Sequence, residues 1–402
     1  MKSKSLPVTN NLTLALACVL GLAATLIPGA QAQTFSVFHS FTGTGDGANP
    51  LSGLVTDGTG NLYGTGSYGG GSSNGVVFKL TAAGVVTVLH NFNGGSDGAN
   101  PEGVLILDKA GNLYGTTTAG GASGAGTVFK VTGAGQESVL YSFSGAADGA
   151  IPEAGLARDP AGNLYGTTTG GGASGNGTVF KLSPPKQKGA AWTEQVLYSF
   201  GTGSDGAIPV GGVTFDSAGN LYGTTSAGGP SGYGTVFQLT RSGSGWTENI
   251  LHDFGNGDDG SVPYAGLISD KAGNFYGAAT QGGTAEGGTI FELTPGSSGW
   301  TFTVLYSIPG WGISGAFRDL IMDPSGNLYG TTHCDGTYSA GTVYKLTPAA
   351  SGYWTYTSLY VFTGGTDGLY SYSNLVFEHG SVYGTTNAGG ADGLGVVFQI
   401  AP

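Results

Sequence analysis

Hydrophobic and polar positions along the chain alternate in short stretches that predict strands rather than helices. Between residues 103 and 143, a short apolar run ends in Asp108-Lys-Ala-Gly-Asn112, where Asp, Gly and Asn favour a tight turn. Further apolar runs cover 113–117, 127–131 and 138–143, and Gly-rich connections separate them. This spacing predicts four short antiparallel strands in about 50 residues, the content of one propeller blade.

The same pattern recurs along the whole chain. Each copy contains Gly-Asn-Leu-Tyr-Gly or a close variant, and the seven tyrosines are Tyr63, Tyr114, Tyr165, Tyr222, Tyr276, Tyr329 and Tyr383. The period is therefore 51 to 57 residues, which is typical of a repeat architecture. We predict an all-β fold of seven four-stranded antiparallel blades.

The two ends of the repeat complement each other. Residues 35–41 match the fourth strand of a blade without the first three, and residues 395–400 match a third strand without a fourth. Pairing these two segments completes a seventh blade and removes the open sheet edge between the first and last blades. We therefore predict that residues 33–402 form a single domain, a closed seven-bladed β-propeller.

Composition and charge narrow the classes of partner. The chain has 80 glycines among 402 residues, but they occupy fixed repeat positions and form no Gly-X-Y series, so neither collagen nor disorder is indicated. It carries 13 basic and 25 acidic residues, a net charge of −12. Nucleic acid and anionic membrane surfaces require basic patches, so we expect neither as a partner.

The N-terminus is typical of a secretory signal peptide. Lys2 and Lys4 precede an apolar run from Leu12 to Ile27, and Ala30-Gln-Ala32 is a small-x-small cleavage site. We predict a signal peptide over residues 1–32, with cleavage after Ala32. No later stretch is long and apolar enough for a membrane helix. The expected product is a secreted or periplasmic monomer without a membrane span.

The loop that links successive blades contains an aspartate followed by glycine in six copies: Asp46, Asp97, Asp148, Asp205, Asp259 and Asp367. These aspartates would either form calcium or sugar sites or close local turns. Calcium requires six to eight oxygen ligands, and only Asp258-Asp259 doubles the acid, so turns are favoured. We predict no cofactor, with calcium at Asp258 and Asp259 as the metal candidate.

Three histidines recur at one position of the fourth strand. His39, His90 and His252 stand where other copies have tyrosine. Since these residues lie in different blades, we interpret the position as a packing slot with a polar tip rather than a metal site.

The sixth unit departs from the repeat in two segments, 309–318 and 333–339, which fall on the same face of the predicted ring. The departures would bring together Trp311, Arg318, His333, Asp335 and Tyr338 as a candidate ligand-binding site. If the second segment is extended, His333 and Asp335 share a side and form a His–carboxylate pair beside the Cys334 thiol. No complete triad or metal ligand set follows, and drift in a tolerant loop remains the alternative.

Three linked motifs carry a family resemblance: Gly-Asn-Leu-Tyr-Gly-Thr-Thr, Gly-Gly-x-x-Gly-x-Gly-Thr-Val-Phe-Lys-Leu and Val-Leu-Tyr-Ser-Phe. Together they resemble the Gloeo/Verruco, or GloVer, repeat of exported bacterial proteins, from Phe35 to Ile400. The resemblance implies a tandem-repeat secreted or surface protein without an established activity. More loosely, Asp-x-x-Gly-Asn-Leu-Tyr is similar to the turn and strand of lactonase and lyase propellers.

Three classes of function are compatible with these residues. We favour a binding or interaction module for an extracellular glycan or protein ligand over an enzyme, because no reactive constellation is identifiable. A propeller hydrolase or lyase is the second hypothesis and requires unlike residues from several blades to converge on the channel mouth. A multivalent glycan-binding lectin is the third, suggested by the recurring Asp loops and the tyrosines.

Overall fold

The computed structural model describes residues 33–401 apart from 188, 202, 244, 311–314, 316–317 and 351. The predicted signal peptide over residues 1–32 and the predicted site residue Trp311 lie outside the described residues. The described residues form strands and turns and no helix, so none of them builds an apolar helix that could cross a membrane.

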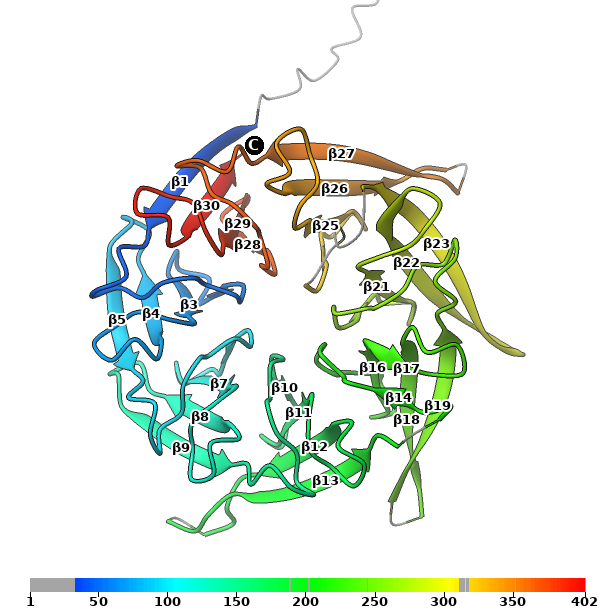
Figure 1. Cartoon of the computed structure of the whole chain (residues 1–402), viewed down its shortest axis with the longest axis horizontal. Helices are drawn as coiled ribbons and strands as arrows, with labels where there is room; N and C mark the ends of the chain where they lie inside the picture. The colour runs from blue at the N-terminus through cyan, green and yellow to red at the C-terminus, as the bar shows by residue number, and fades with distance from the viewer. Residues whose placement is uncertain are drawn as a thin grey trace, which may run out of the picture. The chain divides into compact units, whose positions relative to one another are not determined.

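Seven four-stranded antiparallel sheets stand as blades around a ring (Figure 1), which confirms the predicted fold. Blade 1 consists of β2 (Val55–Thr56), β3 (Leu62–Gly66), β4 (Val76–Leu80) and β5 (Val86–Asn91). Blade 2 consists of β6 (Ile106–Leu107), β7 (Leu113–Thr117), β8 (Thr127–Val131) and β9 (Glu137–Ser142). Blade 3 consists of β10 (Ala157–Arg158), β11 (Leu164–Thr168), β12 (Thr178–Ser183) and β13 (Thr193–Ser199).

The next three blades have the same order but longer outer hairpins. Blade 4 consists of β15 (Thr214–Phe215), β16 (Leu221–Thr225), β18 (Thr235–Ser242) and β19 (Gly245–Asp253), with a small extra pair of β14 (Gly206–Ala207) and β17 (Ala227–Gly228). Blade 5 consists of β20 (Ile268–Ser269), β21 (Phe275–Ala279), β22 (Glu286–Gly296) and β23 (Gly299–Pro309). Blade 6 consists of β24 (Ile321–Met322), β25 (Leu328–Thr331), β26 (Thr342–Pro348) and β27 (Trp354–Val361).

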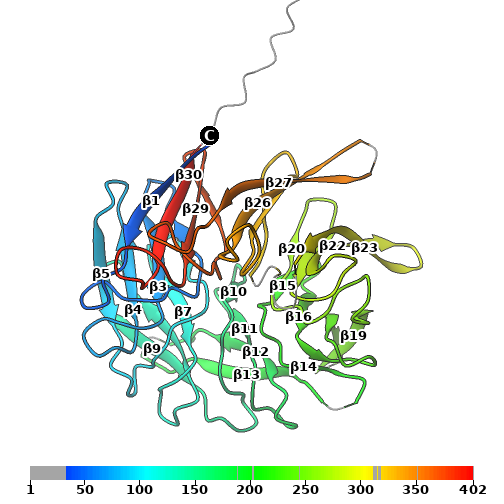
Figure 2. The ribbon, with the colours of Figure 1, turned by 45° about the horizontal axis from the view of Figure 1, so that its top comes forward.

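Blade 7 is built from both ends of the domain. It contains β28 (Val376–Glu378), β29 (Ser381–Thr386) and β30 (Val396–Ala401), and its outer strand is β1 (Thr34–Ser40). The antiparallel register places Phe35 opposite Ile400 and Ser40 opposite Val396. Figure 2 shows β1 lying along β30. The predicted closure of the ring is therefore confirmed.

The inner strands are shorter than the apolar runs indicate. The run from Gly103 to Asp108 yields only the two-residue strand β6. The start of this run lies instead against the next blade, because a Cβ on Gly103 would come within 2.4 Å of the Ala154 carbonyl oxygen. The backbone of each inner segment thus serves blade-to-blade packing before it joins its own sheet.

A glycine in the second strand of every blade lies under an aromatic ring of the third strand. In blade 2, a Cβ on Gly115 would approach the Phe129 ring to 2.7 Å. The seven pairs are Gly64–Phe78, Gly115–Phe129, Gly166–Phe180, Gly223–Phe237, Gly277–Phe291, Gly330–Tyr344 and Gly384–Phe398. All seven rings are fully buried. The absent side chain lets each ring fill the junction between neighbouring blades.

Threonine hydroxyls join neighbouring blades close to the ring's centre. Five of them donate to a carbonyl of the next blade: Thr116 to Ala154, Thr167 to Gly211, Thr224 to Ala265, Thr331 to Ser373 and Thr385 to Ser52. Blade 5 has Ala278 at this position, so the junction of blades 5 and 6 lacks the bond. There the Asp319 carboxylate instead accepts the Gly266 amide of blade 5 at 2.5 Å.

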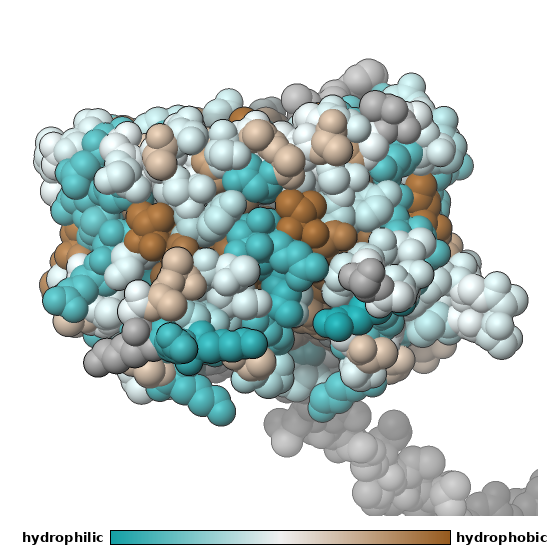
Figure 3. Space-filling view, turned by 90° about the horizontal axis from the view of Figure 1, so that it is seen from below, coloured by the Kyte–Doolittle hydropathy of each residue, from teal (hydrophilic) through white to brown (hydrophobic). Residues whose placement is uncertain are grey.

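Aromatic residues of the outer hairpins pack at the base of the blade junctions. Four tryptophans are half-buried against four separate core clusters: Trp192, Trp246, Trp300 and Trp354. Seen from the side in Figure 3, the visible surface of the ring mixes hydrophilic and scattered hydrophobic residues.

Three outer-strand glutamates place carboxyl groups in blade junctions. Glu137, Glu194 and Glu248 each have one carboxyl oxygen that is buried without a hydrogen-bond partner among the described residues. Burial and the neighbouring Asp148 carboxylate raise the pKa of Glu194 to about 7. An ionised glutamate at this position therefore opposes folding.

The contact between Gly115 and the Phe129 ring predicts that adding a single methyl group at residue 115 lowers the free energy of unfolding. Gly115→Ala should destabilise the protein by about 1–3 kcal/mol, because the Phe129 ring cannot move without displacing packed neighbours. Gly95→Ala is the matched control, since a Cβ there meets nothing within 4 Å, and it should cost at most about 0.5 kcal/mol. Urea unfolding of both variants measures the difference. Equal midpoints would contradict the packing role of the glycine.

The raised pKa of Glu194 predicts that the stability of the folded protein falls as pH rises. An unfolded glutamate has a pKa of about 4.3, and the folded value is about 7, so the folded state binds the proton more tightly between these values. Stability is therefore highest below the unfolded pKa and decreases as pH rises through the folded pKa. Glu194→Gln should raise the melting temperature at pH 8 and change it little at pH 4.

Thermal unfolding across this pH range, followed by fluorescence, measures the effect. Asp392→Asn, in an exposed loop, serves as the control. A Glu194→Gln melting curve that runs parallel to the wild type at every pH would refute the assignment.

Candidate functional site

A narrow cavity of about 160 Å³ lies at the centre of the ring. Its lining residues come from six of the seven blades: Val104, Ile106, Gly155, Leu156, Gly212, Val213, Gly266, Leu267, Asp319 and Asn374. Only the central channel is accessible to so many blades at once. Glycine at three of these positions brings the backbone close to the channel axis.

Strained loop residues position the side chains at one end of this channel. Ile151 has a φ of 57°, although a β-branched residue rarely adopts the left-handed region. Its amide donates to the Ala125 carbonyl of the preceding blade at 2.9 Å, which holds the conformation. Pro152 and Glu153 follow, two residues before the channel-lining Gly155. Asn100, with a φ of 55°, positions Glu102 in the same way.

Two glutamates and an arginine from three blades interact at this end of the channel. Burial raises the pKa of Glu102, the Glu153 carboxylate raises it further, and Arg318 and Thr118 oppose the shift. Burial also raises the pKa of Glu153, against the opposing effects of Arg318 and Thr169. Blades 2 and 6 are not neighbours, so Arg318 acts across the channel on Glu102.

Aromatic side chains complete this end of the channel. The Tyr372 hydroxyl and His333 Nε2 are 3.1 Å apart and hydrogen-bonded. The His333 ring lies 4.3 Å from the Tyr372 ring and 4.6 Å from the Tyr370 ring, between centroids. Burial lowers the pKa of His333 to about 4, so its imidazole is neutral at neutral pH. Arg318 and Tyr264 interact electrostatically with the Tyr372 hydroxyl.

We call Glu102, Glu153, Arg318, His333 and Tyr372 the channel mouth. The arrangement offers carboxyl oxygens, guanidinium donors, a neutral imidazole and phenol groups around one opening. These groups can hydrogen-bond a polar molecule of small size and stack on its flat faces. They come from blades 2, 3, 6 and 7.

The structure separates the residues predicted in the sixth unit. Arg318 and His333 both belong to the channel mouth, whereas Tyr338 is 61% exposed on the outer part of its loop. The backbone bends at His333 and Cys334, so the extended conformation that would align His333 with Asp335 is not present. The Asp335 carboxylate instead accepts the Thr332 hydroxyl within its own blade. Trp311 lies outside the described residues.

Burial also decides the state of the groups near this loop. It raises the pKa of the Cys334 thiol, and Asp335 raises it further, so the thiol is protonated and weakly nucleophilic at neutral pH. Burial likewise raises the pKa of the Asp335 carboxyl. Neither group has the properties of an activated nucleophile.

Glu102 and Glu153 were not predicted as site residues, although the repeat contains a signal for them. In the loop that enters most blades, the residue after the proline differs in chemical type from blade to blade, whereas the Asp-Gly at the start of the loop, the proline and the small residue that follows recur. Leu51, Glu102, Glu153, Val210 and Tyr264 occupy this position, and Tyr372 is its counterpart in blade 7. Chemical variety at one position of a recurrent loop marks the residue that faces the channel, because residues packed between blades are more restricted.

The recurring loop aspartates turn back onto their own loops. Asp46 accepts the Thr42 amide, Asp97 the Asn93 amide and Asp148 the Ser144 amide; Asp205, Asp259 and Asp367 repeat the pattern with Gly201, Gly255 and Thr363. Each also contacts the His or Tyr seven residues earlier, as in His39–Asp46 at 2.9 Å and Tyr141–Asp148 at 2.9 Å. This explains why histidine and tyrosine interchange at that position.

The predicted metal candidate follows the same arrangement. One Asp259 oxygen accepts the Gly255 amide at 2.9 Å and contacts His252 Nε2 at 3.0 Å, while Asp258 is exposed. Across the part of the chain that the structure describes, no group of three or more His, Cys, Asp or Glu side chains has the arrangement of a metal site. Calcium binding at Asp258 and Asp259 stays a prediction.

Comparison with solved structures identifies propellers at low sequence identity. The extracellular domain of a candidate hybrid two-component system from B. thetaiotaomicron is 14% identical, with a TM-score of 0.55, and the match covers 92% of this chain and 42% of that one. A candidate 6-phosphogluconolactonase from Bacteroides fragilis is 15% identical, with a TM-score of 0.51 and coverage of 87% and 98%. Another, from Bacteroides uniformis, is 16% identical, with a TM-score of 0.50 and coverage of 77% and 84%.

These similarities show the fold alone, because sequence identity is low throughout. No functionally curated protein shows significant similarity to the chain. The model of the Gloeobacter/Verrucomicrobia repeat matches residues 25–214 and 188–398, which together span nearly all of the sequence. The chain is therefore a member of the Gloeobacter/Verrucomicrobia repeat family.

Proposed function

We propose that this protein is an exported binding protein that holds a small polyhydroxylated ligand, such as a sugar or sugar acid, at the channel mouth. One observation carries the proposal. Chemically unlike side chains of blades 2, 3, 6 and 7 meet at Glu102, Glu153, Arg318, His333 and Tyr372, in a ring whose other repeat positions are nearly uniform.

The chemistry of these side chains suits hydroxyl-rich molecules. Carboxyl oxygens accept hydrogen bonds from sugar hydroxyls, and Arg318 donates to hydroxyl or carboxylate oxygens. The faces of Tyr370 and Tyr372 suit the apolar face of a sugar ring. His333, which is neutral at neutral pH, orients the Tyr372 hydroxyl through its Nε2.

A hydrolase or lyase acting at the same mouth is the second candidate. It is supported by the pair Glu102 and Glu153, whose pKa values are both raised and which interact with one arginine. A carboxyl group with a raised pKa serves as a general acid, and its ionised neighbour as a base. The fold shared with candidate 6-phosphogluconolactonases is compatible with such a reaction on a sugar lactone.

A multivalent lectin has less support. Its sites would be the recurring loop aspartates, and their oxygens accept amides of their own loops. One site per chain at the channel is therefore favoured over several equivalent sites around the ring.

The binding site predicts a specific loss of affinity. A panel of neutral and acidic mono- and disaccharides, screened by ligand-observed NMR and titrated by calorimetry, should identify a ligand bound once per chain. Arg318→Ala and Glu153→Gln should each weaken its binding by about 10- to 100-fold, because a hydrogen bond to a charged group contributes about 1.5–3 kcal/mol. Tyr353→Ala, on an outer hairpin and 78% exposed, is the control and should bind normally.

Unchanged affinity in both mouth variants would remove the site from the channel mouth. Turnover distinguishes the second candidate: if the ligand is consumed, Glu153→Gln should abolish product formation far more than it weakens binding. Binding of several ligands per chain would favour the lectin.

Export has its own test. We infer from the leader sequence that the mature chain begins at Gln33. Expression of the full gene in a bacterium should yield an exported protein whose N-terminal sequence starts at Gln33. The double substitution Ala30→Gln and Ala32→Gln should block cleavage and leave the longer chain in the membrane fraction. Recovery of an exported chain that still begins at Met1 would contradict the inference.

A further inference from the structure

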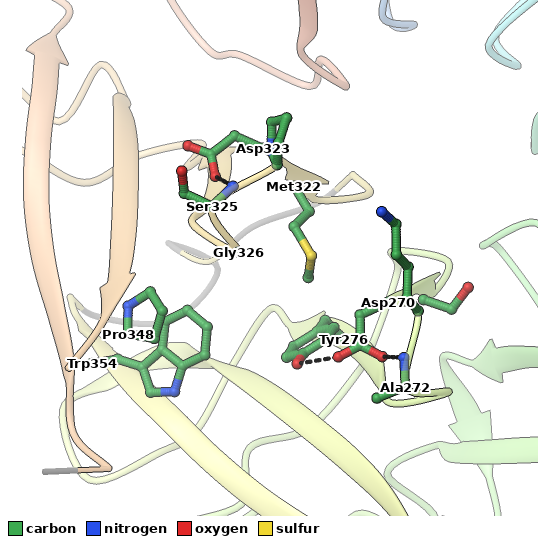
Figure 4. Close-up of a pocket in the computed structure, with 12 residues that line it drawn as sticks. Asp270, Ala272, Tyr276, Met322, Asp323, Ser325, Gly326, Pro348 and Trp354 are labelled. Atoms are coloured by element: carbon green, nitrogen blue, oxygen red, sulfur yellow. Dashed lines mark hydrogen bonds between the residues drawn. The ribbon is translucent and has the colours of Figure 1, made fainter. Parts of the chain in front are cut away.

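A second cavity, of about 830 Å³, lies between blades 5 and 6 (Figure 4), at the turns between first and second strands, whereas the channel mouth lies at the loops that enter the blades. It is lined by the turns that follow β20 and β24 and by Tyr276, Met322, Pro348 and Trp354. We call it the blade 5–6 groove. It belongs to the repeat, since a smaller cavity of about 450 Å³ occupies the same place between blades 3 and 4.

In four of the seven blades, a lysine side chain lies over the tyrosine that corresponds to Tyr276. The second-strand tyrosine of each blade pairs with a third-strand residue that is lysine in four blades, and the lysine nitrogen lies 5.4–5.9 Å from the ring centroid: Lys79–Tyr63, Lys130–Tyr114, Lys181–Tyr165 and Lys345–Tyr329. Blades 4 and 7 have Gln238 and Gln399. Blade 5 instead has Glu292 opposite Tyr276.

This replacement leaves two carboxylates with one hydroxyl donor. The Tyr276 hydroxyl lies 2.9 Å from Glu292 Oε1 and 3.1 Å from Asp270 Oδ2. A phenol has a single proton to donate, so a donation to one carboxylate leaves the other without it. Burial, Glu292 and Asp270 all raise the pKa of Tyr276, so the hydroxyl remains protonated. The groove is therefore adjacent to an excess of negative charge.

The two cavities differ in the balance of acidic and basic side chains around them. Asp270, Asp323 and Lys271 line the blade 5–6 groove, and Glu292 lies behind Tyr276. Within the described residues, Lys271 makes no ion pair with either acid. The cavity between blades 3 and 4 is lined by two acids and two arginines, Arg158 and Arg241, and Lys181 lies over its tyrosine. Of these two cavities, only the blade 5–6 groove has more acidic than basic side chains around it.

The walls of the groove are aromatic and polarizable. Figure 4 shows Trp354 and Tyr276 on two sides, with the Met322 side chain extending between them. The two ring centroids are 6.3 Å apart and the rings are inclined at 64°. Aromatic rings attract cations through their electron-rich faces, and this attraction adds to that of nearby carboxylates. The thioether of methionine adapts to a bulky group.

We propose that the blade 5–6 groove binds the ammonium group of a small organic cation. Trp354, Tyr276 and Met322 contact its apolar substituents, and Asp270 and Glu292 supply the negative charge. The junction is suited to a ligand because it lacks the threonine–carbonyl bond found at five of the other junctions, and its cavity is the larger of the two. This site is separate from the channel mouth and independent of the function proposed there.

Choline is a suitable probe, because its uncharged isostere 3,3-dimethyl-1-butanol has nearly the same shape. The wild-type protein should bind choline at one site in a calorimetric or NMR titration and bind the isostere at least tenfold more weakly. Glu292→Lys, which restores the residue of four other blades, should abolish binding. Trp354→Leu should weaken it at least tenfold.

Glu286→Lys is the matched control, with the same change of charge at the exposed first residue of β22, at the end of the blade away from the groove, and it should bind choline normally. Glu292→Gln, checked by thermal unfolding, removes the charge alone and should also lose binding if Glu292→Lys fails to fold. No choline binding by the wild type, equal binding of the isostere, or full binding by the folded Glu292 variant would each overturn the proposal.

Discussion

The packing of the whole propeller depends on the close contact between a second-strand glycine and a third-strand aromatic side chain. At Gly115 and its six equivalents, no side chain fits beneath the ring. Each aromatic side chain therefore crosses its own blade and packs into the core of the junction with the preceding blade, as Phe129 does against Val77 and Phe92 of blade 1. Blades that share this geometry stack with the same rotation, and seven of them close. Because the contact restricts packing positions, chemical variety is confined to loops and junctions outside it.

The repeat made most of this architecture predictable from the sequence. Its period indicated the blades, and its phase indicated that residues 35–41 would close the ring, within one residue of the observed β1. The channel mouth was only half predictable. Arg318 and His333 stood out because they break the repeat, whereas Glu102 and Glu153 belong to regular loops. Their meeting with Arg318 depends on ring closure, which brings together blades that are distant in sequence.

The misplaced residue has a local explanation. Asp335 was expected beside His333 because alternate residues of an extended strand share a side. Two bends at His333 and Cys334 turn its carboxylate toward Thr332 instead. Glu292 shows the opposite case: its departure from lysine is visible in the sequence, but its meaning depends on Asp270 and on Trp354 of the next blade. Both examples show that side-chain partners are set by backbone direction and neighbouring blades rather than by spacing.

Closure by the two ends also determines when the fold can be completed. The pairing of β1 with β30 joins residues separated by nearly the full length of the domain, from Thr34–Ala401 to Ser40–Val396. Contacts within blades 1 to 6 are local and can form as the chain is made, but β1 has no partner until the last strand exists. Until then the growing polypeptide has two unpaired strand edges. A chain that emerges slowly from a ribosome therefore stays an open arc, and the pairing of β30 with β1 converts it into a ring in a single late step.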